Sequence, residues 1–206
     1  MPRDGTITRT TIMDSAKSLI LGQGFSATSV DKVIEQAGIT KGAFFHHFKT
    51  KADLALALVE RYANLDQAHL DMNLVRAEEL ARDPLQQMLI FIGLLKEEMA
   101  GLTEPFPGCL YASFCYEAQL FDDNTHTVIQ NMMLEWRRRL SSKFVDIIDL
   151  YPPKLDIAPE SLADMALVIY EGAFILSKTL KEPVTTAEQL GHYRNYVELL
   201  FETPAE

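Results

Sequence analysis

Two short amphipathic segments on either side of Gly38 constrain this chain more than any other feature of its sequence. Ser29 is a favourable N-cap for the first segment, residues 30–37, which carries apolar side chains on one face and ends at Gly38. Thr40 can cap the second segment, residues 41–47. A pair of short helices joined by a glycine-containing turn is typical of the helix-turn-helix, whose second helix enters the major groove of DNA. Any small helical bundle can contain such a pair, so the spacing alone leaves the function open.

Charge is distributed unevenly along the 206 residues, whose formal net charge is −10. Residues 1–62 hold eight Lys and Arg and six Asp and Glu, whereas residues 63–206 hold eleven and twenty-three. The acidic excess is therefore carboxy-terminal and argues against indiscriminate nucleic-acid binding. Residues 40–51 carry three lysines, two histidines and no carboxylate, which makes a local cationic patch. The three consecutive arginines at 137–139 are interpreted as a solvated face with acidic neighbours.

Helical periodicity continues along the whole chain, and no segment alternates as a strand would. Thr50 and Asp53 have the spacing of a capping box, which predicts that a long helix begins directly after Thr50. Further helices are expected over residues 85–99, 109–121, 125–150, 159–181 and 187–201. The sequence therefore predicts an all-α fold.

Several classes of protein and of site are excluded or disfavoured by the sequence. The longest apolar run, residues 88–95, is far shorter than the roughly 20 residues of a membrane-spanning helix. No signal-peptide pattern opens the chain, so we expect a cytoplasmic location. Cys109 and Cys115 lie too far apart along a predicted helix to pair, and we expect reduced thiols, with a redox sensor as the alternative. The histidines outside the cationic patch are isolated from other ligands, so no metal site is predicted, and no cofactor is expected.

The segment from Arg9 to Leu54 resembles the DNA-binding part of the TetR family of transcriptional regulators. The residues that follow the family pattern, in order, are Arg9, Ile12, Ala16, Leu19, Gly24-Phe25, Thr28-Ser29-Val30, Ala37-Gly38-Ile39, Lys41-Gly42, His47-Phe48-Lys49 and Lys51. The resemblance implies an all-α subunit of about nine helices. A three-helix DNA-binding domain over residues 1–50 would precede a ligand-sensing and dimerisation domain over residues 51–206. The last two helices would form a four-helix bundle with a second subunit.

The resemblance places the DNA contacts on the second short helix and its flanks. Thr40 and Lys41 stand at the start of the recognition helix, where a hydroxyl and an ammonium can hold phosphate or reach a guanine. Ala43 could touch a thymine methyl, and His46 stands where the family often has tyrosine. The three phenylalanines of this stretch could stack on bases, but core packing is the preferred interpretation, since so small a domain needs large buried residues. The predicted DNA-binding residues are Ser29, Thr40, Lys41, Gly42, Ala43, Phe45, His46, His47 and Lys51.

The carboxy-terminal part is rich in aromatic and methionine side chains, which suits an apolar ligand cavity, although ordinary core packing can explain each residue singly. We expect a small, largely apolar ligand, neutral or cationic, because the acidic balance of residues 63–206 would repel an anion. The predicted ligand-binding residues are Phe91, Phe114, Glu117, Met133, Trp136 and Phe174. The predicted dimer-interface residues are Leu162, Ile169, Gly172, Ala173, Leu176, Tyr193, Val197 and Leu200.

The sequence and the resemblance together predict a homodimeric transcriptional regulator without catalytic residues. It would be a repressor that a small apolar ligand releases from a palindromic operator. Its expected partners are double-stranded operator DNA, a small-molecule inducer and a second copy of the chain, and no membrane. A helical enzyme or carrier that holds a lipid-like molecule is the alternative, although no acid/base or metal motif supports it. A DNA-binding module without a ligand is the third interpretation.

Overall fold

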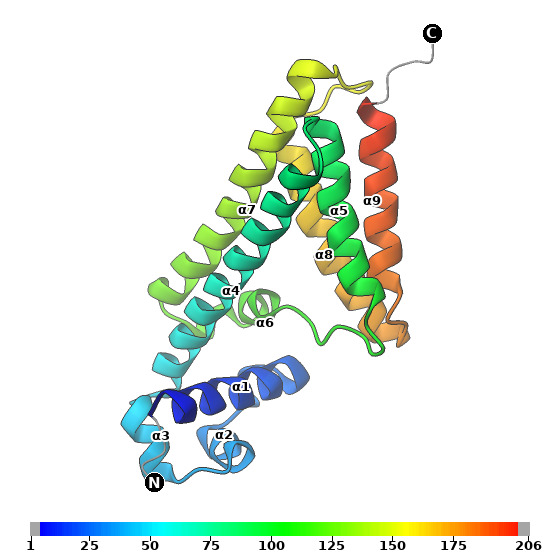
Figure 1. Cartoon of the computed structure of the whole chain (residues 1–206). Coiled ribbons are helices and arrows are strands. Elements are labelled where there is room, and N and C mark those ends of the chain that lie inside the picture. The colour runs from blue at the N-terminus through cyan, green and yellow to red at the C-terminus, as the bar shows by residue number, and fades with distance from the viewer. Residues whose placement is uncertain (1–4, 202–206) are drawn as a thin grey trace. The chain divides into compact units, whose positions relative to one another are not determined.

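The computed structural model describes residues 5–201, which form helices joined by short connections and contain no strand (Figure 1). The elements are α1 (Gly5–Gln23), α2 (Val30–Ala37), α3 (Lys41–His47), α4 (Lys51–Leu80), α5 (Pro84–Ala100), α6 (Leu110–Tyr116), the 3-10 turn η1 (Ala118–Leu120), α7 (Asp123–Leu150), α8 (Pro159–Leu180) and α9 (Thr185–Phe201). The predicted all-α fold is confirmed. The ends of the two predicted domains, residues 1–4 and 202–206, lie outside the described residues.

Most helix ends lie within two residues of their predicted positions, because caps and prolines mark them locally. The Thr50 amide donates to the Asp53 carboxylate at 2.9 Å, and the Asp53 amide donates to the Thr50 hydroxyl at 3.0 Å, which completes the predicted capping box. The main difference concerns residues 109–121, predicted as one helix. Glu117 leaves the helical region with φ −115° and ψ 31°, and this residue separates α6 from η1.

The chain divides into two compact units, which are described separately. The first comprises residues 1–65 and 108–131. Within it α1 packs against α2, α3 and α6. Ile12 on α1, Phe44 on α3 and Phe114 on α6 are fully buried. The core of this unit therefore joins the predicted helix-turn-helix to the short helix α6.

The second unit comprises residues 66–107 and 132–206. Helix α9 packs against both α5 and α8 (Figure 1). Val197 on α9 is fully buried, and the hydroxyl of the buried Tyr193 donates to the Leu162 carbonyl on α8 at 2.8 Å. Apolar burial and this hydrogen bond together fix the last helix within its own subunit.

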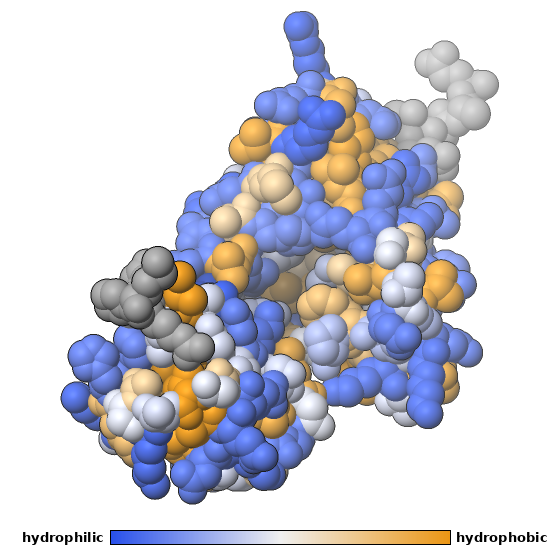
Figure 2. Space-filling view, turned by 60° about the horizontal axis from the view of Figure 1, so that its bottom comes forward, coloured by the Kyte–Doolittle hydropathy of each residue, from blue (hydrophilic) through white to orange (hydrophobic). Residues whose placement is uncertain are grey.

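The surface is mainly hydrophilic on the face drawn in Figure 2, with apolar residues gathered in a few patches. Among the exposed large apolar side chains, four lie on α8: Val168, Ile175, Leu176 and Leu180. No helix within residues 5–201 combines the length and the apolar character that crossing a membrane requires.

Candidate nucleic-acid interface

Local hydrogen bonds fix the two helices on either side of Gly38. The Ser29 hydroxyl accepts the Lys32 amide at 3.2 Å, and the Thr40 hydroxyl accepts the Ala43 amide at 3.2 Å. Gly38 has φ 62° and ψ 37°, the left-handed conformation that ends α2 and that glycine adopts without a steric cost. Both caps and the turn glycine were predictable because each acts on residues only a few positions away.

Helix α3 buries one face and exposes the other. Phe44 is 0% exposed and Phe48 is 2% exposed, so two of the three phenylalanines face inward. Lys41, Gly42 and His46 are exposed on the outer side. A helix of seven residues has little stability of its own, so the buried rings determine which side chains it presents outward.

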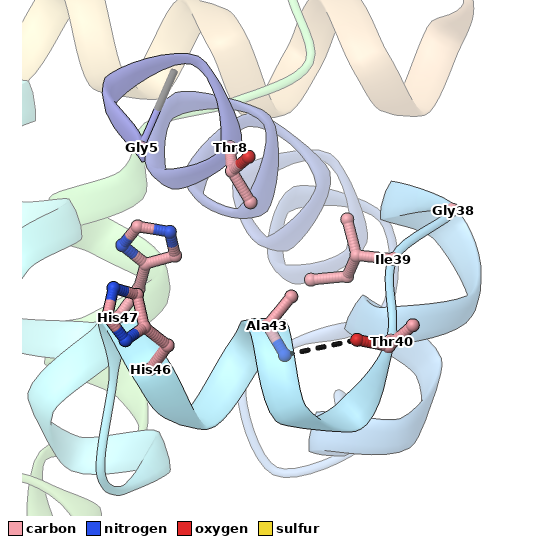
Figure 3. A pocket seen from close by; sticks show the side chains of 8 residues that line it. All are labelled: Gly5, Thr8, Gly38, Ile39, Thr40, Ala43, His46 and His47. Carbon is pink, nitrogen blue, oxygen red and sulfur yellow. Dashed lines mark hydrogen bonds between the residues drawn. The ribbon is translucent and has the colours of Figure 1, made fainter. Parts of the chain in front are cut away.

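An open hollow of about 490 Å³ lies beside this helix. It is lined by Gly5, Thr8, Gly38, Ile39, Thr40, Ala43, His46 and His47. Figure 3 shows Thr8 of α1 opposite Ile39 and Ala43, with the two imidazoles at the other end of the hollow. Four predicted DNA-binding residues therefore line one space. Sequence reasoning missed Thr8, because a single sequence does not reveal which turn of α1 lies beside α3.

Lys41 supplies an exposed cation at the start of α3. Its ammonium lies 3.6 Å from the Asp31 carboxylate, and the two side chains are 70% and 80% exposed. An ion pair this exposed contributes little stability and rearranges easily, so Lys41 can still reach a phosphate or a base. Phe45, 37% exposed, lies on the same helix, and its carbonyl accepts the Lys49 ammonium at 3.3 Å.

His47 is the half-buried histidine of the hollow, with its ring centre 5.1 Å from that of His46. Burial lowers the pKa of His47 below its usual value of 6.5, and the neighbouring His46 and Arg9 lower that pKa further. The imidazole is therefore mainly neutral near pH 7 in the DNA-free protein. A phosphate against it would favour the protonated form.

Solved structures share this arrangement of helices. The regulatory protein TetR from Rhodobacter sphaeroides superimposes with a TM-score of 0.76 at 24% identity, covering 92% of this chain and 98% of that one. A transcriptional regulator of the TetR family from Agrobacterium tumefaciens superimposes with a TM-score of 0.77 at 20% identity, covering 96% and 100%. These likenesses establish the fold.

Sequence comparison identifies the family. The family model for bacterial regulatory proteins of the tetR family matches residues 12–58. Transcriptional regulator AcuR of Cereibacter sphaeroides is 27% identical over 187 residues, which cover 87% of this chain and 80% of that protein. The HTH-type transcriptional repressor DhaR of Mycobacterium sp. is 21% identical over 173 residues, or 84% and 83%. The chain belongs to the TetR family. It is accordingly a DNA-binding transcriptional regulator and not an enzyme.

In this TetR-family regulator, Lys51, a predicted phosphate contact, is engaged within the subunit. Its ammonium donates to the Phe25 carbonyl at 2.6 Å and lies 3.8 Å from the centre of the Phe25 ring. Burial lowers the pKa of Lys51, and the nearby Glu117 carboxylate acts in the opposite direction. A phosphate contact through Lys51 would have to compete with this internal site.

The predicted ligand-binding residues are divided between the two units. Four belong to the second unit: Phe91, Met133, Trp136 and Phe174. The ring centres of Phe91 and Trp136 are 6.4 Å apart, and Phe174 stacks on Phe106 at 4.4 Å. The Trp136 indole donates to the Asp66 carboxylate at 3.1 Å, a polar group that the sequence did not single out.

Phe114 and Glu117 belong to the first unit and contact the connection between α1 and α2. The Phe114 ring meets the Phe25 ring edge-on at 5.6 Å, and the Glu117 carboxylate accepts the backbone N–H groups of Phe25 and Ser26. Helical periodicity gave no indication of these contacts, because their partners lie about ninety positions away.

Five of the eight predicted dimer-interface residues are buried inside the subunit: Leu162, Ala173, Tyr193, Val197 and Leu200. Leu176 is 49% exposed, and Ile169 and Gly172 are half-buried. Apolar periodicity identifies the buried faces of α8 and α9, but it does not distinguish a face that packs within the subunit from one that meets a partner.

We predict that the affinity for operator DNA increases as the pH falls from about 8 to about 6, because His47 takes up a proton when a phosphate lies against it. Titration by fluorescence anisotropy at constant ionic strength measures this dependence. His47→Gln should remove up to about one proton from it. His46→Gln separates the contribution of the neighbouring ring, and His192→Gln, an exposed position on α9, is the control. A pH slope that His47→Gln leaves unchanged would contradict the prediction.

Proposed function

We propose that this regulator is a homodimeric repressor that binds a palindromic operator and is released from it by a small apolar ligand. The observation that carries the proposal is the outer face of α3. Thr40, Ala43 and His46 line one open hollow there. The exposed Lys41 lies at the start of the same helix, while Phe44 and Phe48 are buried in the core. A short basic helix held in this way has the chemistry that the major groove accepts, with hydroxyl and ammonium donors for phosphates and guanine.

Operator selection from random double-stranded DNA tests the proposal directly. The selected sequence should contain two related half-sites whose centres are about one helical turn apart. Lys41→Gln should weaken specific binding about 5–150-fold and relax the base preference at one position of each half-site, because a lost base contact costs about 1–3 kcal/mol. Lys181→Gln removes one positive charge from the end of α8 in the second unit and is the matched control. Selection that returns no preferred sequence would rule out specific operator binding.

An exposed apolar face on α8 supports dimer formation. Val168, Ile175, Leu176 and Leu180 lie at helical spacing and are all at least 49% exposed. Gly172 lies on the same face, and a side chain built at this glycine would meet nothing within 4 Å. Such a face loses contact with water when a second copy covers it, and dimers are typical of the family.

We predict that Ile175→Asp converts the dimer into monomers, because a second subunit would bury the new carboxylate without a partner. Analytical ultracentrifugation measures the change. Thr127→Asp, an exposed position on α7 in the first unit, is the control and should remain dimeric. Ile175→Asp should also bind the full operator weakly, since bridging two half-sites requires two subunits. A stable dimer of Ile175→Asp would indicate that the dimer interface lies on another surface.

The aromatic side chains of the second unit support an apolar ligand. Two pairs of rings lie in this unit, Phe91 with Trp136 and Phe106 with Phe174. Burial of apolar ligand surface against such rings contributes about 25 cal/mol per Å² to the free energy of binding. The carboxylate of Asp66 beside the indole N–H favours a neutral or cationic molecule over an anion. A ligand that binds the DNA-incompetent arrangement more tightly would lower operator affinity by about 5–150-fold.

We predict that an inducer found by release of the operator changes the fluorescence of Trp136, the chain's single tryptophan. Met133→Ala should weaken inducer binding about tenfold, because a half-buried side chain near Trp136 loses apolar contact with the ligand. Leu134→Ala, at the adjacent exposed position, is the matched control and should bind normally. An inducer that leaves the fluorescence unchanged and binds Met133→Ala at full strength occupies a different site.

A further inference from the structure

The connection between α1 and α2 holds the carboxylate of a residue 92 positions away. The backbone N–H groups of Phe25 and Ser26 donate to separate oxygens of Glu117, each at 2.8 Å. The pKa of Glu117 is lowered, first by the hydrogen bond from the Ser26 side chain and then by the two backbone N–H groups and Lys51. Charge-assisted hydrogen bonds to both carboxylate oxygens are strong and fix the orientation of the group. The backbone of the turn therefore binds one ionised carboxylate in a defined orientation.

Lys51 holds the same turn at its carbonyl side. Its ammonium donates to the Phe25 carbonyl at 2.6 Å. Phe25 is thus held by an anion at its amide and by a cation at its carbonyl. Phe25 lies just after α1, Lys51 is the first residue of α4, and Glu117 directly follows α6. The contacts of Phe25 therefore link three helices, α1, α4 and α6.

Apolar contacts attach the turn to α6 independently of the carboxylate. The Phe25 ring lies 5.6 Å from the Phe114 ring and 4.6 Å from the Phe121 ring, centre to centre. Gly24 has φ 85°, and a Cβ atom there would lie 2.7 Å from the Glu117 Oε1. The absence of a side chain at Gly24 therefore admits the carboxylate. Because the aromatic contacts already attach the turn to α6, the additional effect of Glu117 is to fix the orientation of the turn relative to α6.

Glu117 occupies a break between two helical segments of different pitch. Helix α6 ends at Tyr116, and the 3-10 turn begins at Ala118. Adding or removing one residue at the end of α6 would rotate the next side chain by about 100° around the helix axis. The carboxylate cannot follow that rotation and keep both N–H groups. A change at the end of α6 is therefore sufficient to withdraw Glu117 from the turn.

We propose that Glu117 is a positioning residue for operator binding, a latch that holds α1, α2 and α3 in the orientation the operator requires. The inference rests on the proposed binding of a palindromic operator by a dimer. When the latch opens, α1 to α3 sample several orientations, and the arrangement with both recognition helices about 34–36 Å apart becomes less populated. Binding to a single half-site needs one subunit only and does not depend on that spacing.

The test compares Glu117→Gln with the wild type on two duplexes, the selected operator and the same duplex with one half-site scrambled. The amide of glutamine replaces one acceptor oxygen with a donor, so one of the two N–H groups loses its partner. We expect affinity for the full operator to fall about tenfold and affinity for the half-site to change less than about twofold. Hydrogen exchange at the Phe25 and Ser26 amides should become faster. Glu104→Gln, an exposed position in the second unit, is the charge-matched control.

The proposed role of Glu117 is refuted if Glu117→Gln binds the full operator as the wild type does, binds it more tightly, or loses affinity equally for both duplexes. An equal loss would indicate a general weakening of the domain.

If Glu117→Gln does not fold, Ser26→Ala removes only the hydroxyl that donates to Glu117, and it should give a smaller loss of affinity confined to the full operator. Lys41→Gln in the same assay separates the two proposals. Weak binding by Lys41→Gln with normal binding by Glu117→Gln refutes the latch alone, whereas the lack of any preferred sequence refutes operator binding itself.

Discussion

The burial of Phe44 and Phe48 determines what α3 can present to DNA. The helix has seven residues, too few for the backbone hydrogen bonds alone to keep it formed in water. Burying each ring contributes roughly 1.5–3 kcal/mol, and the rings reach the core only when one side of the helix faces α1 and α2. The positions of Thr40, Lys41 and His46 on the outer side follow from that packing. The interface is therefore specified by residues that do not touch DNA.

The cations of this chain differ in what surrounds them. In the basic run of α7, Arg137 pairs with Asp164 at 2.7 Å and Arg139 pairs with Asp71 at 2.6 Å, so the charge of this run is compensated within the second unit. The segment from Thr40 to Lys51 contains no carboxylate of its own. A protein with an overall charge of −10 can thus approach a polyanion through one small patch, while the rest of its surface disfavours contact elsewhere.

The sequence was informative wherever a residue acts on close neighbours in the chain, and uninformative where its partner is distant. Ser29, Gly38 and Thr40 shape α2 and α3 through bonds that span a few positions, so the two short helices and their turn were predictable from local residues, whereas their assignment to DNA binding came from the resemblance to the family. Glu117 and Lys51 meet at Phe25, and no local pattern indicates that meeting. For the same reason apolar spacing on α9 identified a buried face but not the helix that covers it, which is α5 or α8 of the same subunit.

Gly24, directly after α1, and Gly38, at the end of α2, both have positive φ, and they are constrained for different reasons. At Gly38 a side chain would meet nothing within 4 Å, so only the left-handed conformation favours glycine, and asparagine is the usual alternative in such a turn. At Gly24 the backbone conformation disfavours a side chain, and a Cβ atom would displace the Glu117 carboxylate from its present position. The turn at Gly38 thus sets the direction of the recognition helix, and the connection between α1 and α2 receives the carboxylate that follows α6. In the proposed latch, a change in α6 acts on α3 through the backbone of the connection between α1 and α2, and it requires no movement of the side chains that face DNA.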